Sequence, residues 1–368
     1  MPSPRVGHPG HAGTVRPLRI LAGHLASGTG GNPELRMLYS SIADAGPVEI
    51  EPFSTAALFR ERWDVIHVYW PEWLIKRTGG LASTALDCVR LLCLLQLARR
   101  RGAKVVWTAN NIRPHEVDRL GVLNAFVAVF SRIVDQVICP SQTALDQFLF
   151  EYPAISGIDA RAIPTGTFHE VYRDDRPTMQ EAREVLGLPL ESRVILMFGH
   201  VRPYKNIAQL IRYYRTVAER RDDTFLLIAG KPLDDDHAAA IHAECAKLKN
   251  VRADLRFIAD DEVQYYLRAS NCVVIGTSYA VNTASALLGL TFDRPVMMPH
   301  RGAAIEMLDS AGAEWVHTYE GGLRSSVLER ALTVEQPEGS PAISDHYDWR
   351  RSGSAHFEAF AAIAGRDF

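Results

Sequence analysis

Short apolar runs rich in β-branched residues alternate with helical stretches along almost the whole chain of 368 residues. RPLRILAG (16–23) is the first run, and WDVIHVYW (63–70) and AKVVWTA (103–109) follow it with helical segments between them. Strands that alternate with helices at this spacing indicate βαβ units, in which helices cover both faces of a parallel sheet. We therefore expect an α/β protein.

The second half repeats this alternation, with strands predicted at RVILMFG (193–199), TFLLIAG (224–230), DLRFIA (254–259), NCVVIGT (271–277) and DRPVMMP (293–299). Because a chain of this length exceeds the usual size of one core, we expect two doubly wound, Rossmann-like domains. Ligands bind beyond the carboxyl ends of the strands in such sheets, so we expect the two domains to face an interdomain cleft. The predicted divisions are a disordered lead-in (1–16), an N-terminal domain (17–171), a C-terminal domain (172–340) and a C-terminal helix (341–368).

The composition describes an ordinary globular protein, with 47% hydrophobic and 23% charged residues. A net charge of -3 argues against a general nucleic-acid-binding protein. The five cysteines are scattered without CxxC spacing, which favours free thiols in a reducing cytoplasm. The first 17 residues lack the apolar core of a signal peptide. We expect a cytoplasmic protein.

One very apolar helix, LDCVRLLCLLQLARRRG (86–102), ends in three consecutive arginines. One interpretation is a buried helix of an α/β layer, whose arginines interact favourably with the C-terminal end of the helix dipole. The other is a peripheral contact with the inner face of an anionic membrane. The sequence leaves both interpretations open.

The stretch FGHVRPYKN joins a predicted strand to the helix that follows it. Gly199 allows a ligand to approach the backbone, and Arg202 and Lys205 supply positive charge. The helix that begins near Asn206 points its N-terminal N–H groups to the same place. These features predict a clamp for a pyrophosphate group, whereas the alternative is a solvated basic turn.

A second polar stretch, SYAVNTASALLGL, opens another helix at the end of a predicted strand. Asn282, Thr283 and Ser285 would bind a phosphate or sugar hydroxyls there. Plain capping of the helix is the alternative.

Two strand ends in the N-terminal half carry polar and aromatic residues. WTANNIRPHE presents Asn110 for sugar hydroxyls, and His115 and Glu116 as proton acceptors. HVYWPEWL places Glu72 between two tryptophans, in the manner of a carbohydrate subsite, although the tryptophans would serve equally well in the core. The remaining candidates for this side, including those of the glycine loop SGTGGNP, are Gly28, Gly30, Gly31, Asn32, Trp70 and Trp73.

Metal binding is not indicated by the sequence. His237 and His242 lie five residues apart on a charged helix, and Asp234 to Asp236 precede that helix in the manner of a cap. We expect neither a metal nor another cofactor.

The order of elements and three motifs resemble the GT-B glycosyltransferases of the family 4 type. They are similar in particular to bacterial GDP-mannose-dependent β-mannosyltransferases of exopolysaccharide assembly. The motifs are Trp70-Pro71-Glu72, the segment from Thr108 to Glu116, and the segment from Gly199 to Asn206. The resemblance covers nearly the whole chain, and it implies that the C-terminal helix crosses back to the N-terminal domain.

Four positions, which belong to three sequence elements, depart from the pattern of that family. Asn110 replaces the usual histidine of the T-x-H-N segment, and Thr165 replaces the histidine of the I-P-H-G segment. The two glutamates of the E-x7-E element fall at Ala280 and Leu288. In retaining members of the family these glutamates commonly bind the ribose and the sugar of the donor. Their loss puts a retaining mechanism in doubt, and these positions do not indicate which sugar is transferred.

The resemblance implies a metal-independent hexosyltransferase that moves a sugar, with mannose from GDP-mannose favoured, to an acceptor hydroxyl. The C-terminal domain would bind the nucleotide sugar through Arg202 and Lys205, and the N-terminal domain would bind a glycan, lipid-linked or small-molecule acceptor. Glu72, then His115, then Glu116 are the candidate bases if the reaction inverts the anomeric centre. The alternatives are a nucleotide-sugar epimerase of GT-B fold, a non-catalytic binding subunit and a phosphorylase.

Overall fold

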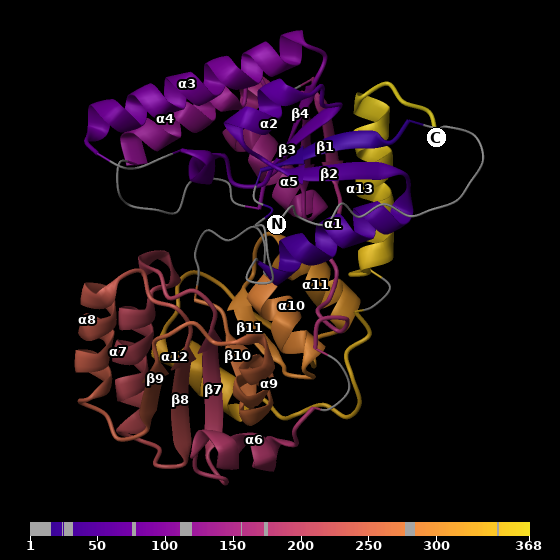
Figure 1. Cartoon of the computed structure of the whole chain (residues 1–368). Helices are drawn as coiled ribbons and strands as arrows, with labels where there is room; N and C mark the ends of the chain where they lie inside the picture. The colour runs from indigo at the N-terminus through magenta and orange to yellow at the C-terminus, as the bar shows by residue number, and fades with distance from the viewer. Residues whose placement is uncertain are drawn as a thin grey trace. The chain divides into compact units, whose positions relative to one another are not determined.

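The chain divides into two compact units in the structure, which is a computed structural model (Figure 1). Unit 1 comprises Met1–Gly166 and His346–Phe368, and unit 2 comprises Thr167–Asp345. The structure describes residues 16–23, 25, 32–75, 79–110, 120–155, 157–172, 176–276, 284–343 and 346–368. All five cysteines lie in these ranges and are free.

Unit 1 is built on a six-stranded sheet whose pairs are all parallel, in the order β2-β1-β3-β4-β5-β6. The inner strands are runs of β-branched and aromatic residues that are buried on both faces, as parallel sheets require. The strands are β1 (Leu18–Ala22), β2 (Val48–Pro52), β3 (Val65–Val68), β4 (Lys104–Thr108), β5 (Gln136–Cys139) and β6 (Asp159–Ala162).

The helices of unit 1 fall into packed pairs, α1 with α13 and α3 with α4 (Figure 1). Residues of α1 and α13 share one hydrophobic core with β1, β3, β4 and β5. The helices are α1 (Pro33–Ala45), α2 (Thr55–Arg60), α3 (Leu81–Arg100), α4 (Leu120–Phe130), α5 (Gln142–Glu151) and α13 (Trp349–Ile363), with short 3-10 turns η1 (Pro71–Leu74) and η2 (Pro153–Ile155).

The C-terminal helix α13 is fixed to unit 1 by contacts that only glycine allows. A Cβ on Gly353 would lie 2.4 Å from the backbone of Ser41 in α1, and one on Gly46 would lie 2.3 Å from the ring of Phe357. A Cβ on Gly166 would meet Trp349, the first residue of α13, at 2.3 Å. The backbones of α1 and α13 therefore approach closely, and the last helix is an integral part of unit 1.

We expect Gly353→Val to lower the free energy of unfolding by about 1–3 kcal/mol, because the new side chain overlaps the α1 backbone in a filled core. Ser354→Val is the matched control, since Ser354 is exposed one position further along the same helix. Urea unfolding of both variants measures the difference. Equal losses in the two variants would contradict the close packing of α13 on α1.

Unit 2 repeats the architecture with a second six-stranded parallel sheet, in the order β12-β11-β10-β7-β8-β9. Its strands are β7 (Arg193–Phe198), β8 (Thr224–Ala229), β9 (Val251–Asp254), β10 (Cys272–Val274), β11 (Val296–Pro299) and β12 (Val316–Tyr319). The helices are α6 (Met179–Leu186), α7 (Ile207–Ala218), α8 (Asp235–Cys245), α9 (Asp260–Ala269), α10 (Ala284–Thr291), α11 (Ala303–Ala311) and α12 (Ser325–Thr333), with the 3-10 turn η3 (Pro203–Lys205).

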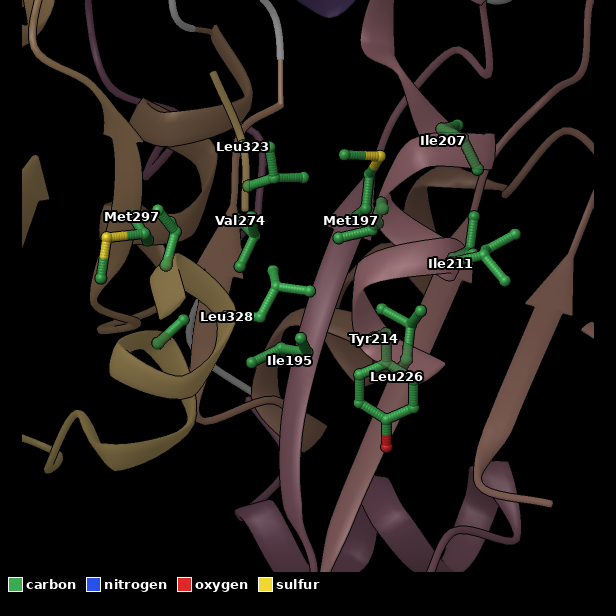
Figure 2. Close-up of a cluster of buried hydrophobic side chains, with 14 of the residues drawn as sticks. Ile195, Met197, Ile207, Ile211, Tyr214, Leu226, Val274, Met297, Leu323 and Leu328 are labelled. Atoms are coloured by element: carbon green, nitrogen blue, oxygen red, sulfur yellow. The ribbon is translucent and has the colours of Figure 1, made fainter. Parts of the chain in front are cut away.

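One face of this second sheet packs on α7 and α12 through a large apolar cluster (Figure 2). Ile195 and Met197 of β7 lie at its centre, and Ile211 and Tyr214 of α7 pack on one side while Leu328 of α12 packs on the other. Burial of these side chains holds β7 rigidly, and the loop that follows β7 therefore starts from a fixed position.

The prediction of two doubly wound sheets is confirmed, and so is the amphipathic helix that begins at Trp349. The predicted strand over 254–259 is wrong, because the strand is β9, Val251–Asp254, and the more apolar residues that follow it form a loop. The edge strand β2 is absent from the prediction. Both errors concern edge strands, where charged residues alternate with apolar ones and hide the strand pattern.

Candidate active site

The loops after β7 and β8 meet at the carboxyl edge of the unit 2 sheet, and two glycines make the contact possible. Gly199 has a φ of 100° and donates its N–H to the carbonyl of Ala229 at 3.0 Å. Gly230 has a φ of 144°, and a Cβ there would lie 2.0 Å from the carbonyl oxygen of Gly199. A larger residue at position 230 would displace the turn at Gly199.

Lys205 lies over this turn. Its Nζ donates to the carbonyl of Phe198 at 3.3 Å, and a Cβ on Gly199 would lie only 3.1 Å from the same Nζ. Burial, followed by the positive charge of Arg202, lowers the pKa of Lys205 to about 8. Desolvation and a like charge both disfavour the ammonium form, and a bound anion would relieve both effects.

Arg202 is held beside Lys205 by backbone carbonyls. Its Nη1 donates to the carbonyls of Val201 and Lys231, each at 3.1 Å. Within the described parts of the chain, no partner binds its Nε or Nη2, so two nitrogens of the guanidinium fork remain for a ligand. Burial, then Arg202, Lys205 and Lys231, lower the pKa of His200 to about 4, which leaves that imidazole neutral at pH 7.

Two further predicted residues come to the same loop. Ser285, in the first turn of α10, points its hydroxyl at the carbonyl of Phe198 at 3.4 Å. Asn206 adopts a left-handed conformation with a φ of 55° and donates its side-chain amide to the carbonyl of Gly276 at 3.2 Å. Asn206 thus shapes the turn that leads into α7.

We define the diphosphate clamp as Gly199, Arg202, Lys205 and Ser285. Two cations and a hydroxyl converge there on a backbone turn at the start of α7 and α10. An open α/β sheet binds ligands at this edge, and the N-termini of helices favour negative charge. The arrangement can therefore hold two linked phosphate groups. Asn282 and Thr283 lie outside the described residues.

The carboxyl edge of the unit 1 sheet carries a buried polar cluster. Glu34, in the first turn of α1, accepts a hydrogen bond from the hydroxyl of Tyr69 at 2.9 Å and a long one from the amide of Asn110 at 3.5 Å. All three side chains are at least 95% buried. Asn32 caps α1 by accepting from the backbone N–H of Glu34 at 3.0 Å, which sets the direction of the helix start.

A second chain of hydrogen bonds lies beneath this cluster. The imidazole of His67 joins the hydroxyl of Tyr39 at 2.9 Å and that of Thr108 at 2.8 Å, and all three side chains are buried. The rings of His67 and Tyr69 meet edge to face. The polar groups below the edge are thereby fixed in position.

Glu72 lies on η1, directly after β3, and is 95% buried. Trp70, which precedes it, is half-buried and packs edge to face on Tyr69 with ring centroids 4.7 Å apart. The side chain of Trp73 lies outside the described part of the chain, and so do the remaining candidates of this unit, Gly28, Gly30, Gly31, His115 and Glu116.

Sequence reasoning missed three residues of these edges, namely Glu34, Gly230 and Lys231. A glutamate in the first turn of a helix is usually an exposed residue that interacts favourably with the helix dipole. The sequence therefore contains no sign that Glu34 is buried. Gly230 and Lys231 follow β8 in the same way that Gly199 follows β7. A glycine at the same place after both strands could have indicated that the two loops meet. Within the described ranges no cluster of three or more histidine, cysteine, aspartate or glutamate side chains is placed to hold a metal.

Comparison with known proteins finds one family model and several relatives that this chain is similar to. The family model "Glycosyl transferases group 1" matches residues 178–288, which include the diphosphate clamp. The GDP-mannose:glycolipid 4-beta-D-mannosyltransferase of Xanthomonas campestris pv. campestris is 27% identical over 339 residues, which cover 91% of this chain and 90% of that protein.

Solved structures share the fold. Sucrose-phosphate synthase from Thermosynechococcus elongatus matches with a TM-score of 0.63 and 16% identity, over 95% of this chain and 96% of that chain. Anabaena HepE in complex with UDP-glucose matches with a TM-score of 0.60 and 16% identity, over 94% of this chain and 97% of that chain. At this identity the likeness concerns the fold alone.

Proposed function

We propose that this chain, which is a glycosyltransferase of GT-B fold, transfers a mannosyl group from GDP-mannose to the hydroxyl of a glycolipid acceptor in the assembly of a polysaccharide. The comparisons favour a transferase over an epimerase or a non-catalytic subunit. The choice of mannose and of the guanine nucleotide rests on the similarity to the Xanthomonas enzyme and on the motifs from Trp70 to Glu72 and from Gly199 to Asn206.

The diphosphate clamp is the observation that carries the proposal. When the bond between the sugar and the diphosphate breaks, negative charge grows on the leaving phosphate oxygens. Lys205 and Arg202 are positioned before the reaction, in a partly buried site, so they stabilise this charge without reorganising. We propose that these cations, together with the start of α7, meet the charge of the leaving group and that neither a metal ion nor another cofactor takes part.

A β-linked product from GDP-α-mannose requires inversion at the anomeric carbon. The acceptor oxygen would form its bond to that carbon as the bond to the diphosphate breaks, GDP would leave, and the acceptor proton would pass to a base. We assign Glu72 as this base, with His115 and Glu116 as the remaining candidates. A carboxylate can accept the proton, and Glu72 lies on η1, after β3 at the carboxyl edge of the unit 1 sheet.

Glu34 has a different role in the proposal. Its Oε1 already accepts from Tyr69 and Asn110, so we assign it to hold these two side chains in place rather than to take a proton. Asn110 stands where related enzymes carry a histidine, and its amide would bind a sugar hydroxyl of the donor or acceptor. We place the reaction in the cytoplasm.

A donor panel tests the function. The melting temperature of the protein is measured with GDP-mannose, UDP-glucose, dTDP-glucose and ADP-glucose. We expect GDP-mannose to raise it well above the others, since a ligand stabilises the folded state that binds it. If none of the four raised it, unit 2 would not be a donor site, and if UDP-glucose alone did, the assignment of the guanine nucleotide would fall.

The pKa of Lys205 predicts how GDP binding depends on pH. The ammonium is charged below pH 8 and loses its proton above it, because burial and Arg202 lower its pKa to about 8. We therefore expect the contribution of Lys205 to the affinity for GDP to be steady well below pH 8 and to fall above it by up to about tenfold for each pH unit. Calorimetric titration at several pH values measures this.

Lys205→Arg is the matched control for that experiment. A guanidinium stays charged throughout this range, so the fall above pH 8 should disappear in the variant. Titration of the ligand itself affects both proteins alike. The same fall in Lys205→Arg as in the wild type would assign the titration to another group and contradict the role of Lys205.

A further inference from the structure

Helix α3 has two apolar faces, and only one of them is covered by unit 1. The residues of the covered face lie three or four positions apart and are buried. They are Thr84, Cys88, Leu91, Leu95 and Ala98. The opposite face carries Leu86, Val89, Cys93 and Leu97, which lie three and four residues apart and therefore form one stripe. Leu86 is 68%, Val89 56% and Leu97 44% exposed.

A surface helix of an ordinary globular protein carries charged and polar residues on its outer face. In α3 that face instead carries four exposed apolar side chains in a row along the helix. The neighbouring helix α4, which packs beside α3, also turns small apolar residues outward, at Ala125, Ala128 and Val129. An exposed apolar surface of this kind marks a place where the protein meets an apolar partner. We name Leu86, Val89, Cys93 and Leu97 the outer stripe.

Positive charge borders the outer stripe. Arg90 and Arg100 are exposed and fall on the same side of the helix as the stripe, and among the residues described no carboxylate pairs with either of them. Arg99 is different, since Asp135 binds its guanidinium at 2.7 Å. Asp87, at the margin of this side, is half-buried. The outward surface of α3 thus combines apolar side chains with net positive charge.

We propose that the outer stripe rests on the surface of an anionic lipid bilayer, with Arg90 and Arg100 bound to lipid phosphates. Long apolar side chains enter the boundary between headgroups and acyl chains, while arginines beside them reach the phosphates. This combination matches a bilayer surface better than an uncharged apolar partner. Of the two interpretations that the sequence left open, a buried helix or a membrane contact, it favours the membrane contact.

The helix lies on the bilayer and does not cross it. By length and composition α3 passes as a candidate membrane span. However, Leu91 and Leu95 on its inner side are buried in unit 1, and removing them from that core would break the packing against β4 and α4. One face remains available, which is the geometry of an interfacial helix.

A second copy of this chain is a poorer occupant of the same face. Arg90 lies at the middle of α3, so two helices that crossed about a twofold axis there would bring one Arg90 against the other. Like charges that approach in a desolvated interface oppose association. An anionic surface has the opposite charge and incurs no such repulsion.

The position of α3 links this surface to the proposed chemistry, and this point alone rests on the proposed function. The helix begins at Leu81, shortly after η1 with Glu72, and ends before β4, so its first turn lies toward the carboxyl edge of the unit 1 sheet. Leu81 itself is 61% exposed. A glycolipid anchored in the bilayer would then present its sugar near that edge.

Vesicle sedimentation of the full chain tests the proposal. We expect the wild type to bind vesicles of phosphatidylcholine mixed with phosphatidylglycerol, to bind pure phosphatidylcholine weakly, and to be released by salt. Leu86→Gln with Val89→Gln should weaken binding at least about tenfold, through the loss of apolar burial. Arg90→Gln with Arg100→Gln should weaken it about 30-fold, since each arginine contributes about 1 kcal/mol near an anionic surface.

Val185→Gln is the control, because Val185 is 63% exposed on α6 of unit 2 and should leave vesicle binding unchanged. Absence of binding by the wild type, or unchanged binding by both double variants, would overturn the proposal. So would a wild-type dimer in sedimentation velocity that Leu86→Gln with Val89→Gln converts to a monomer. GDP-mannose should stabilise all these variants alike, and its failure to stabilise the wild type would refute the proposed function while leaving the vesicle result intact.

Discussion

Replacement of Lys205 by alanine is expected to lower kcat/KM for mannosyl transfer by about 10²–10³-fold, with little loss of stability. The ammonium lies over the turn at Gly199, where the leaving diphosphate would bind, and removal of one such preorganised group usually costs this much. The free energy of unfolding should change little, because burial of the charged ammonium is itself unfavourable. The lowered pKa of Lys205 reflects this unfavourable burial. Steady-state kinetics and thermal unfolding measure the two effects.

The matched control is Lys249→Ala, an exposed lysine that precedes β9 and therefore lies at the amino edge of the same sheet. It should keep wild-type kinetics. If Lys205→Ala also kept wild-type kinetics while folding normally, the diphosphate clamp would not take part in catalysis. GDP binding that survived in Lys205→Ala would point to the same conclusion.

The second large effect is expected for Glu72→Gln, which should lower kcat by about 10²–10⁴-fold and leave GDP binding unchanged. The amide keeps the size of the side chain but cannot accept the proton of the acceptor hydroxyl. Since Glu72 lies in unit 1 and the diphosphate clamp lies in unit 2, the substitution should not change the affinity for GDP. Single-turnover kinetics and calorimetry with GDP separate the two quantities.

Glu34→Gln provides the comparison that distinguishes the two buried carboxylates. Because Glu34 holds Tyr69 and Asn110, its amide variant should raise KM or lower stability more than it lowers kcat. A large loss of kcat in Glu34→Gln together with a small one in Glu72→Gln would exchange their roles. Small losses of kcat in both would move the base to His115 or Glu116.

Much of the fold could be predicted because the inner strands are long apolar runs. Strands such as β7 and β8 are buried on both faces, so their β-branched residues stand out from the amphipathic helices around them. The edge strands β2 and β9 alternate apolar with charged residues, and every position of both strands is half-buried. A short alternating pattern is weak evidence on its own, and these two strands were missed or misplaced.

The clamp was predictable because its residues lie together in the sequence. Gly199, Arg202 and Lys205 share one loop, and a strand before it and a helix after it fix where that loop must lie. Glu34 and Asn110 are 76 residues apart and meet only because β1 and β4 end at the same edge of one sheet. Such contacts depend on the order of strands, which the sequence pattern does not state.

The central claim is tested most directly by following labelled mannose. The wild-type protein is incubated with GDP-mannose labelled in the sugar and a bacterial glycolipid fraction, and the label is measured in the lipid phase and as free nucleotide sugar. We predict that label enters the lipid phase with the wild type and falls at least about 100-fold with Lys205→Ala. Label that never leaves the nucleotide sugar, or that enters lipid equally well with Lys205→Ala, would contradict the account.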